Sequence, residues 1–139
     1  MPFPQITTCL VCEVVRQEML GKYALLGFFG VAPQIRIALR DFRLPYTVSF
    51  FFIGGSGSGT YHVELRVRGP SGQLVQGESV PLDGALDPSI PVSNFILFFN
   101  GLLPGPGQYR ISLVANQAET YATNINFDQG LGVNWHALA

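Results

Sequence analysis

Eight residues near the middle of the chain alternate strictly between apolar and polar side chains. They run Tyr61-His62-Val63-Glu64-Leu65-Arg66-Val67-Arg68. Because successive side chains of a β-strand point to opposite faces, this pattern predicts a strand with one face buried and the other in water. Gly69-Pro70-Ser71-Gly72 follows and an extended pattern resumes at Gln73. We therefore expect a β-hairpin that returns through a tight turn and continues to Val80.

Similar short segments recur along all 139 residues, each bounded by Gly, Pro, Asn or Asp. The spacing is typical of an antiparallel immunoglobulin-like β-sandwich, so we predict a single all-β domain over residues 1–139 with about eight strands. Residues 35–40 also fit a short helix, because Ile35, Leu39 and Phe42 lie at helical spacing, but a strand is preferred. The other expected strands are 6–15, 22–29, 46–53, 92–99, 108–115 and 119–127, with a single helical turn or connection at 16–21, a loop at 81–91 and a short turn at 116–118.

The composition narrows the partners that we expect. Charged residues make up 12% of the chain and the formal net charge is −1, so no broad basic surface is available for a nucleic acid backbone. No stretch of about 18 apolar residues occurs, so no membrane span is expected, and the first residues lack the pattern of a secretion signal. We therefore expect a cytoplasmic protein that has no membrane span and does not bind nucleic acid.

Two of the expected strands are apolar at consecutive positions, unlike the strand at 61–68. Large apolar side chains on both faces of a sandwich strand predict an interaction surface, because one of each consecutive pair must face outward. No charged residue lies in 44–61 or 88–109 to discourage pairing of strand edges. The alternative is that other parts of the same chain cover the second face. The candidate interface residues are Phe50, Phe51, Phe52, Phe95, Leu97, Phe98 and Phe99.

Arg36, Arg40 and Arg43 form the densest positive cluster of the sequence. Arginine pairs with carboxylates in a two-pronged geometry, so we predict that Arg36 and Arg40 make ion pairs at a surface or interface. Binding of an anion or stacking on nucleic acid bases is the alternative, but the basic footprint is small.

Few residues suggest chemistry. Cys9 and Cys12 have the spacing of a redox or zinc motif, but on a strand their side chains point to opposite faces, so we expect two unpaired, packed cysteines. The two histidines, His62 and His136, lie far apart in the sequence, and we expect His62 to be solvated. The alternative is a salt-bridge or hydrogen-bond partner for His62, such as Glu64 or an arginine. We predict no catalytic residue, metal or cofactor.

Two loops have compositions that could indicate a phosphate, nucleophile or calcium site, but neither loop meets the requirements of such a site. The Gly/Ser-rich loop at 54–59 opens a strand rather than a helix, so it is neither a phosphate loop nor a nucleophile elbow. Asp83 and Asp87 are too few oxygen ligands for a calcium loop, and we expect solvated acids in a turn.

Several short motifs resemble a family of small bacterial β-sandwich proteins without an assigned activity. These motifs are Cys12-Glu13, Arg16, Glu18, Gly21-Lys22, Leu25-Leu26-Gly27, Phe29, and Pro104-Gly105-x-Gly107-x-Tyr109-Arg110-Ile111. The resemblance implies the fold and no substrate. Tyr109 resembles the tyrosine near the start of a late strand in immunoglobulin-like sandwiches. This chain departs from the family in the neutral turn Asn116-Gln117-Ala118 and in the very apolar segment 95–99.

Together these observations predict a non-enzymatic structural or assembly module that self-associates into a homo-oligomer or filament through apolar strand faces and edges. The alternative is an adaptor or recognition domain that binds another protein or a small ligand through its end loops, residues 54–59 and 81–91.

Overall fold

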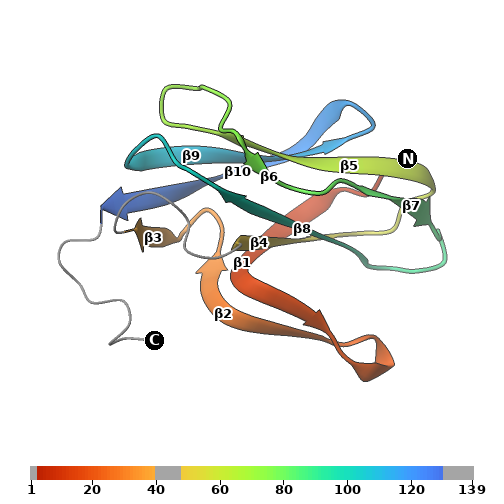
Figure 1. Cartoon of the computed structure of the whole chain (residues 1–139). Coiled ribbons are helices and arrows are strands. Elements are labelled where there is room, and N and C mark those ends of the chain that lie inside the picture. The colour runs from red at the N-terminus through yellow and green to blue at the C-terminus, as the bar shows by residue number, and fades with distance from the viewer. Residues whose placement is uncertain (1–2, 40–47, 130–139) are drawn as a thin grey trace.

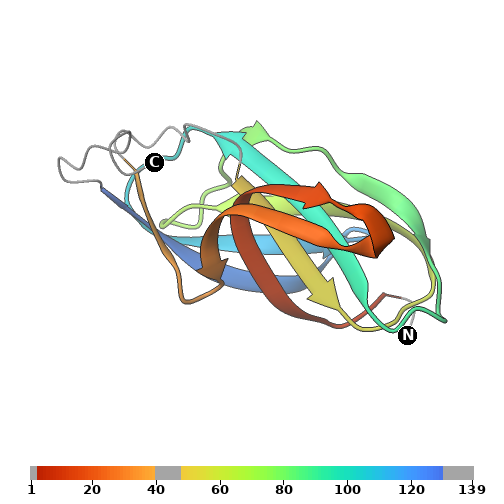
Figure 2. The ribbon, with the colours of Figure 1, turned by 90° about the horizontal axis from the view of Figure 1, so that it is seen from below.

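The computed structural model describes residues 3–39 and 48–129. These residues form two five-stranded β-sheets that face each other (Figures 1 and 2), and their only helical element is the 3-10 turn Met19–Gly21. The predicted all-β, sandwich-like fold is therefore confirmed, with ten strands in place of about eight. The strands are β1 (Ile6–Gln17), β2 (Tyr23–Val31), β3 (Arg36–Leu39), β4 (Val48–Gly54), β5 (Gly59–Arg68), β6 (Gly77–Glu78), β7 (Leu82–Leu86), β8 (Ser93–Gly101), β9 (Gly107–Ala115) and β10 (Ala118–Gln129).

The two sheets differ in strand order. Sheet A has the order β2-β1-β4-β8-β6, and sheet B has the order β3-β10-β9-β5-β7. Neighbouring strands are antiparallel, except that β3 runs parallel to β10. Most sheet neighbours come from distant parts of the chain.

The core lies between the sheets and uses alternate residues of each central strand. In β5, Val63 and Val67 are buried while Glu64 is exposed, which confirms the alternation predicted for this strand. In β9, which pairs with β5, Tyr109 and Ile111 point into the same core. Alternation of this kind is what a sheet with one buried face requires.

The segment after β5 does not return as predicted. The turn itself forms, because Gly72 N–H donates to Gly69 O and a single bridge joins Arg68 to Leu74. The chain then leaves sheet B, and β6 pairs with β8 in sheet A. The expected hairpin continuing to Val80 is therefore wrong beyond its first bridge.

The predicted loop at 81–91 is also partly wrong, because residues Leu82–Leu86 form β7 beside β5. Leu82 and Leu86 pack against the core from this edge strand. The bounding Pro81 and the Asp83-Gly84 pair are turn-like residues, and their composition concealed the short strand.

Two other local predictions are confirmed. Residues Arg36–Leu39 form a strand, although residues 40–43 lie outside the described part of the chain. β9 and β10 are joined by a two-residue turn in which Asn116 has φ +50° and Gln117 has φ +71°. Left-handed conformations at both positions match the right-handed twist of a hairpin, and asparagine tolerates them well.

Candidate interaction surface

The first two strands form a hairpin that extends beyond sheet A. β1 pairs with β4 only as far as the pair Cys12 and Ser49, whereas its pairing with β2 continues to Gln17 and Tyr23. Among the described residues, which leave out 40–47 directly before β4, no further strand pairs with the outer half of the hairpin, and this half projects from the sandwich in Figure 1. The 3-10 turn Met19–Gly21 forms its tip.

Irregular pairing bends this hairpin away from the plane of sheet A. The register between β1 and β2 shifts at Val11 and Cys12, which marks a β-bulge. In β2, Gly27 has φ +64°, and a Cβ built there would lie 2.6 Å from Glu13 Cγ. Bulges and such glycines increase the local twist and bend of a strand.

The hairpin contacts the outer face of sheet A through Tyr23, which lies next to the tip, and through the backbone of Glu13 on its stem. The rings of Tyr23 and Phe51 meet edge to face with centroids 5.1 Å apart, and Phe51 is buried. Ser49 Oγ donates a hydrogen bond to Glu13 O at 3.0 Å. The chain thus covers its own second sheet face at Phe51, which was the alternative to an interface there.

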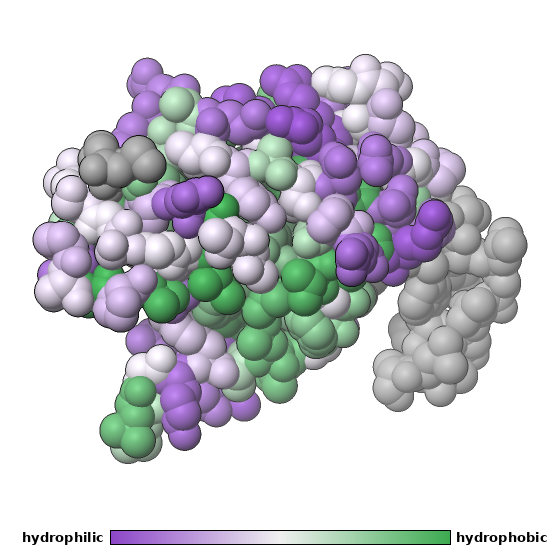
Figure 3. Space-filling model, turned by 180° about the vertical axis from the view of Figure 1, so that it is seen from behind, coloured by the Kyte–Doolittle hydropathy of each residue, from purple (hydrophilic) through white to green (hydrophobic). Residues whose placement is uncertain are grey.

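The rest of the hairpin leaves large apolar side chains in water. At its tip, Met19 and Leu20 are 83% and 91% exposed, and Leu20 is held in the left-handed region at φ +64°. On its stem, Phe28 is 55% exposed, and Val14 and Leu26 are exposed on the same side as a cross-strand pair. Figure 3 shows hydrophobic residues gathered over this part of the molecule and at the projecting tip. We call this set the apolar hairpin surface: Val14, Met19, Leu20, Leu26, Phe28 and Val31.

The summed exposed area is at the upper end of the range for one patch of a monomer, and it is divided between the tip and the stem of the hairpin (Figure 3). With side chains of roughly 150–200 Å² each, the exposed fractions leave on the order of 600 Å² of apolar surface on these six residues. The largest apolar patch of an ordinary monomer covers about 300–600 Å² and is often an interaction site. The apolar hairpin surface is therefore the strongest candidate site among the described residues.

The two sheets also differ in charge. Strands β2, β4 and β8 contain no charged residue. The outer face of sheet B instead carries ion pairs: Arg36 Nη1 lies 3.2 Å from Asp128 Oδ2, and Arg110 Nη2 lies 2.9 Å from Glu119 Oε2. The hairpin is not free of charge, because Glu13, Arg16, Glu18 and Lys22 lie in β1 and around the tip, and Arg16 Nε lies 3.8 Å from Glu18 Oε2.

Most of the interface residues expected from the sequence lie in the core instead. Buried between the sheets are Phe50, Phe52, Phe95, Leu97 and Phe99. Phe51 and Phe98 lie opposite Ile96 and Ser49 on the outer side of sheet A, so one member of each consecutive pair does face outward. Phe98 is half-buried there, and Phe51 is buried beneath Tyr23. Arg36 is exposed in its ion pair with Asp128, and Arg40 lies outside the described residues.

Neither cysteine is chemically activated. Cys9 and Cys12 are free thiols and both are buried, as predicted. Burial raises the pKa of the Cys9 thiol to about 12, and burial also raises the pKa of Cys12, whose Sγ contacts Val14 O at 3.4 Å. Thiols held in the protonated form are poor nucleophiles and poor metal ligands. No group of three potential metal ligands is present in residues 3–39 and 48–129.

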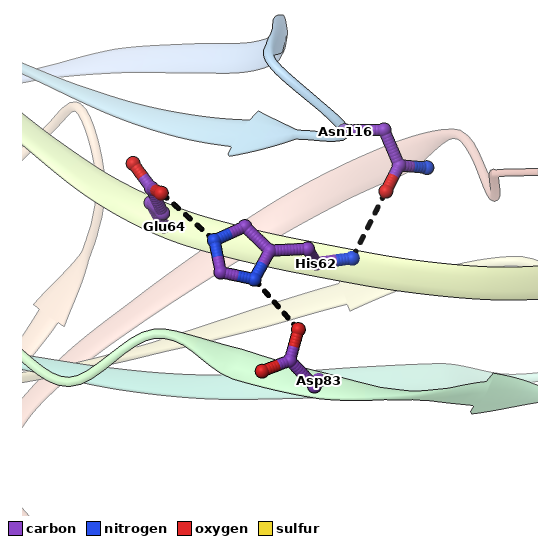
Figure 4. Close-up of polar contacts among 4 residues, drawn as sticks. All are labelled: His62, Glu64, Asp83 and Asn116. Carbon is purple, nitrogen blue, oxygen red and sulfur yellow. Dashed lines mark hydrogen bonds and ion pairs between the residues drawn. The ribbon is translucent and has the colours of Figure 1, made fainter.

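His62 joins three elements on the outer face of sheet B (Figure 4). Its Nδ1 lies 2.6 Å from Asp83 Oδ1 of β7, and its Nε2 lies 2.8 Å from Glu64 Oε1. Its backbone N–H donates to Asn116 Oδ1 at 2.9 Å. The hydrogen bonds to Asp83 and then Glu64 raise the pKa of His62 above its ordinary value. The structure therefore shows the alternative to a merely solvated histidine, a hydrogen-bond partner in Glu64, and adds Asp83 as a second partner.

This geometry gives stability a definite pH dependence. A raised pKa means that the contribution of protonated His62 is complete below its ordinary pKa and is lost as pH rises through the raised value. We therefore expect His62→Gln to lower the melting temperature more at about pH 6 than at about pH 8.5. Asp83→Asn, which removes the main cause of the shift, should reduce the difference between wild type and His62→Gln. Equal losses at both pH values in calorimetry would contradict this assignment.

The acidic residues of the predicted end loop serve local structure. Asp87 Oδ1 accepts hydrogen bonds from Ser89 N–H at 2.9 Å and from Ser89 Oγ at 2.7 Å, and both lower the pKa of Asp87. This is the turn with a solvated acid that we predicted, in which the carboxylate caps the following backbone. A small cavity of about 190 Å³ lies beside it, lined in part by Tyr61 and Ile90.

Comparison with known proteins adds no identification. No protein-family model matches the chain, and no curated protein matches it. The resemblance to a bacterial β-sandwich family therefore remains a prediction. Within the described residues, no helix has the length and apolar character needed to span a membrane.

Proposed function

We propose that the sandwich is immunoglobulin-like. In that fold, strands A, B, E and D form one sheet and C, F and G the other, which also accepts C′. The spatial orders β1-β4-β8-β6 and β10-β9-β5-β7 match A-B-E-D and G-F-C-C′, with β2 and β3 as added edge strands. The match is not complete, because β6 precedes β7 in the chain whereas D follows C′ in the immunoglobulin fold. Tyr109, at the start of β9, supports the assignment because its Oη donates to Gly105 O at 2.5 Å, as a tyrosine corner does.

We propose further that the protein is a non-enzymatic structural module that self-associates through the apolar hairpin surface. One observation carries this proposal: the projecting hairpin exposes six large apolar side chains with no covering element among the described residues. A stable interface buries about 800 Å² on each partner, and the apolar hairpin surface supplies most of that area.

The shape of the hairpin favours side-chain packing over strand addition. β2 is an edge strand without charged residues or proline, which favours pairing with another chain. Gly27 at φ +64° and Gly30 at φ +140°, together with the bulge opposite them, interrupt the regular edge that such pairing needs. The predicted use of apolar faces therefore has stronger support than the predicted use of edges.

The stem of the hairpin provides the test. Phe28→Asp places a carboxylate in the middle of the apolar hairpin surface, at a side chain that is 55% exposed. We expect a folded protein whose self-association is at least about tenfold weaker, because a buried interface would have to desolvate the charge. Light scattering coupled to size-exclusion chromatography measures the change in mass.

Ile90→Asp is the matched control, because Ile90 is 51% exposed and lies outside the hairpin. It should associate as the wild type does. If Phe28→Asp associates as strongly as Ile90→Asp, the hairpin stem is not the interface.

A further inference from the structure

We propose that β8 binds an extended, uncharged peptide segment of another protein, which pairs with it as an added strand of sheet A. The backbone edge concerned is that of residues 93–99 on the side away from β4, and we call it the open β8 edge. In the strand order of sheet A it lies across β4 and β1 from β2. The inference therefore does not rest on self-association through the hairpin.

β8 has a partner strand along its whole length on one side only. Residues 93–99 pair with Val48–Gly54 of β4, whereas the described strand on the other side is β6, which pairs with Asn100 and Gly101 (Figure 1). Backbone groups of alternate residues point to opposite sides of a strand, so those of 93–99 that point away from β4 have no strand partner within 3–39 and 48–129. An unpaired edge of this kind is a template for another extended chain.

β8 also lacks the features that usually discourage strand addition. It contains neither a charged residue nor proline, and its pairing with β4 is regular throughout. β2 differs, because Gly27 and Gly30 have positive φ and its pairing with β1 contains a bulge. The edge strands of sheet B, β3 and β7, are only four and five residues long and contain Arg36 and Asp83. Of the described edges, the open β8 edge is therefore the one best suited to accept a strand.

Two hollows lie beside the two ends of the open β8 edge. The first has a volume of about 190 Å³ and is lined in part by Tyr61, Leu86 and Phe95. The second has a volume of about 310 Å³ and is lined in part by Ser79 and Phe99. The Oγ of Ser79 is buried and has no hydrogen-bond partner among the described residues, which is unusual for a buried hydroxyl. Alternate side chains of an added strand point to the core side of the sheet, where these hollows lie.

These features select the chemistry of the partner. An extended peptide presents N–H and C=O groups at the spacing of the unpaired groups of β8. β4 and β8 carry no charge, so an uncharged segment avoids burying a charge without a partner, and β-branched residues suit a strand. The β8 strand of a second copy fits less well. Its inward side chains Phe95, Leu97 and Phe99 are buried in its own core and are not free to enter the hollows.

Titration with a synthetic peptide tests the proposal. The probe alternates valine and threonine over the length of the open β8 edge and carries lysines at both ends for solubility. The control has the same sequence with N-methyl groups on two adjacent central residues, which removes a backbone donor from each of its edges. We expect a dissociation constant below about 1 mM for the probe and at least about tenfold weaker binding of the control. Nuclear magnetic resonance should also show slower hydrogen exchange at amides of 93–99 when the probe is bound.

A matched pair of variants tests the position of the site. Ile96→Lys and Ile53→Lys each place a lysine at a half-buried position on the outer side of sheet A, but Ile96 lies in β8 and Ile53 in β4, which has a strand on both sides. Lysine on an edge strand discourages strand addition, so Ile96→Lys should bind the probe at least about tenfold more weakly than Ile53→Lys. If thermal melting shows that Ile96→Lys does not fold, Asn94→Lys replaces it, because Asn94 is exposed in the same strand.

Four results would overturn the proposal. Absence of probe binding up to about 1 mM, or equal binding of probe and control, would mean that the edge does not accept a strand. Equal affinity of the two lysine variants would place the probe elsewhere. Full protection of the amides of 93–99 before any peptide is added would mean that the chain itself or a second copy already fills the edge. None of these results decides the role of the hairpin, which the association of Phe28→Asp tests separately.

Discussion

Replacing Phe52 by Ala is expected to lower the free energy of unfolding by about 3–5 kcal/mol, whereas Phe28→Ala should lower it by less than about 1 kcal/mol. Both are phenylalanines in strands of sheet A, but Phe52 is fully buried in β4 and Phe28 is 55% exposed in β2. Truncation of Phe52 removes packing with Tyr121, whose ring centroid is 6.0 Å away, and leaves a cavity between the sheets. Truncation of Phe28 removes a side chain that already meets water.

Denaturant titration of the two variants measures this contrast. The protein concentration must be low enough that association does not add to stability, since binding to the folded state stabilises it. Equal losses for Phe52→Ala and Phe28→Ala would mean that the hairpin stem is packed within the single chain, and the apolar hairpin surface would then not exist in solution.

Phe51→Asp is expected to be the most destabilising substitution on the outer side of sheet A. Phe51 is buried beneath Tyr23, so the carboxylate that replaces its ring would lose its hydration shell. No contact among the described residues gives it a charged partner in exchange. Loss of the ring and burial of the charge should together cost about 4 kcal/mol or more. That is a large part of the stability of an ordinary domain, so we expect a mostly unfolded or aggregating protein.

Phe98→Asp is the matched comparison, because Phe98 is half-buried on the same side of sheet A opposite Ser49. It should remain folded with a smaller loss, as thermal melting would show. If both side chains belonged to an interface, as the sequence pattern predicts, both substitutions would give folded subunits that no longer associate. A folded Phe51→Asp variant that no longer associates would show that the interface lies on the outer face of sheet A.

The strands of this protein could be predicted well where one face meets water. The alternation at 61–68 and the turn at Asn116 and Gln117 are local signals, and each has one structural solution. β6 and β7 could not be found in this way, because two residues at Gly77–Glu78 and five at Leu82–Leu86 carry too little pattern. Their partners, β8 and β5, lie elsewhere in the chain, so their pairing is a property of the assembled sheets.

The candidate site was missed because the same sequence pattern has two physical causes. Consecutive apolar residues in β4 arise where sheet A is buried on one face and covered by Tyr23 on the other. The apolar pairs Leu25-Leu26 and Phe28-Phe29 lie in β2, which belongs to the hairpin that covers sheet A. Part of β2 remains exposed. The sequence contained this second signal, together with Met19 and Leu20 at a turn. Which of the two runs faces water depends on the bend of the hairpin, and the sequence pattern does not specify it.

The central claim is that this sandwich self-associates through the apolar hairpin surface. Sedimentation velocity of the wild type from about 1 to about 100 µM tests it most directly, because that range covers the dissociation constants of modest interfaces. We predict a weight-average mass that rises with concentration well above the 15.2 kDa of one chain, and a rise for Phe28→Asp that is shifted to at least about tenfold higher concentration. A wild-type mass of 15.2 kDa across the whole range would contradict the claim.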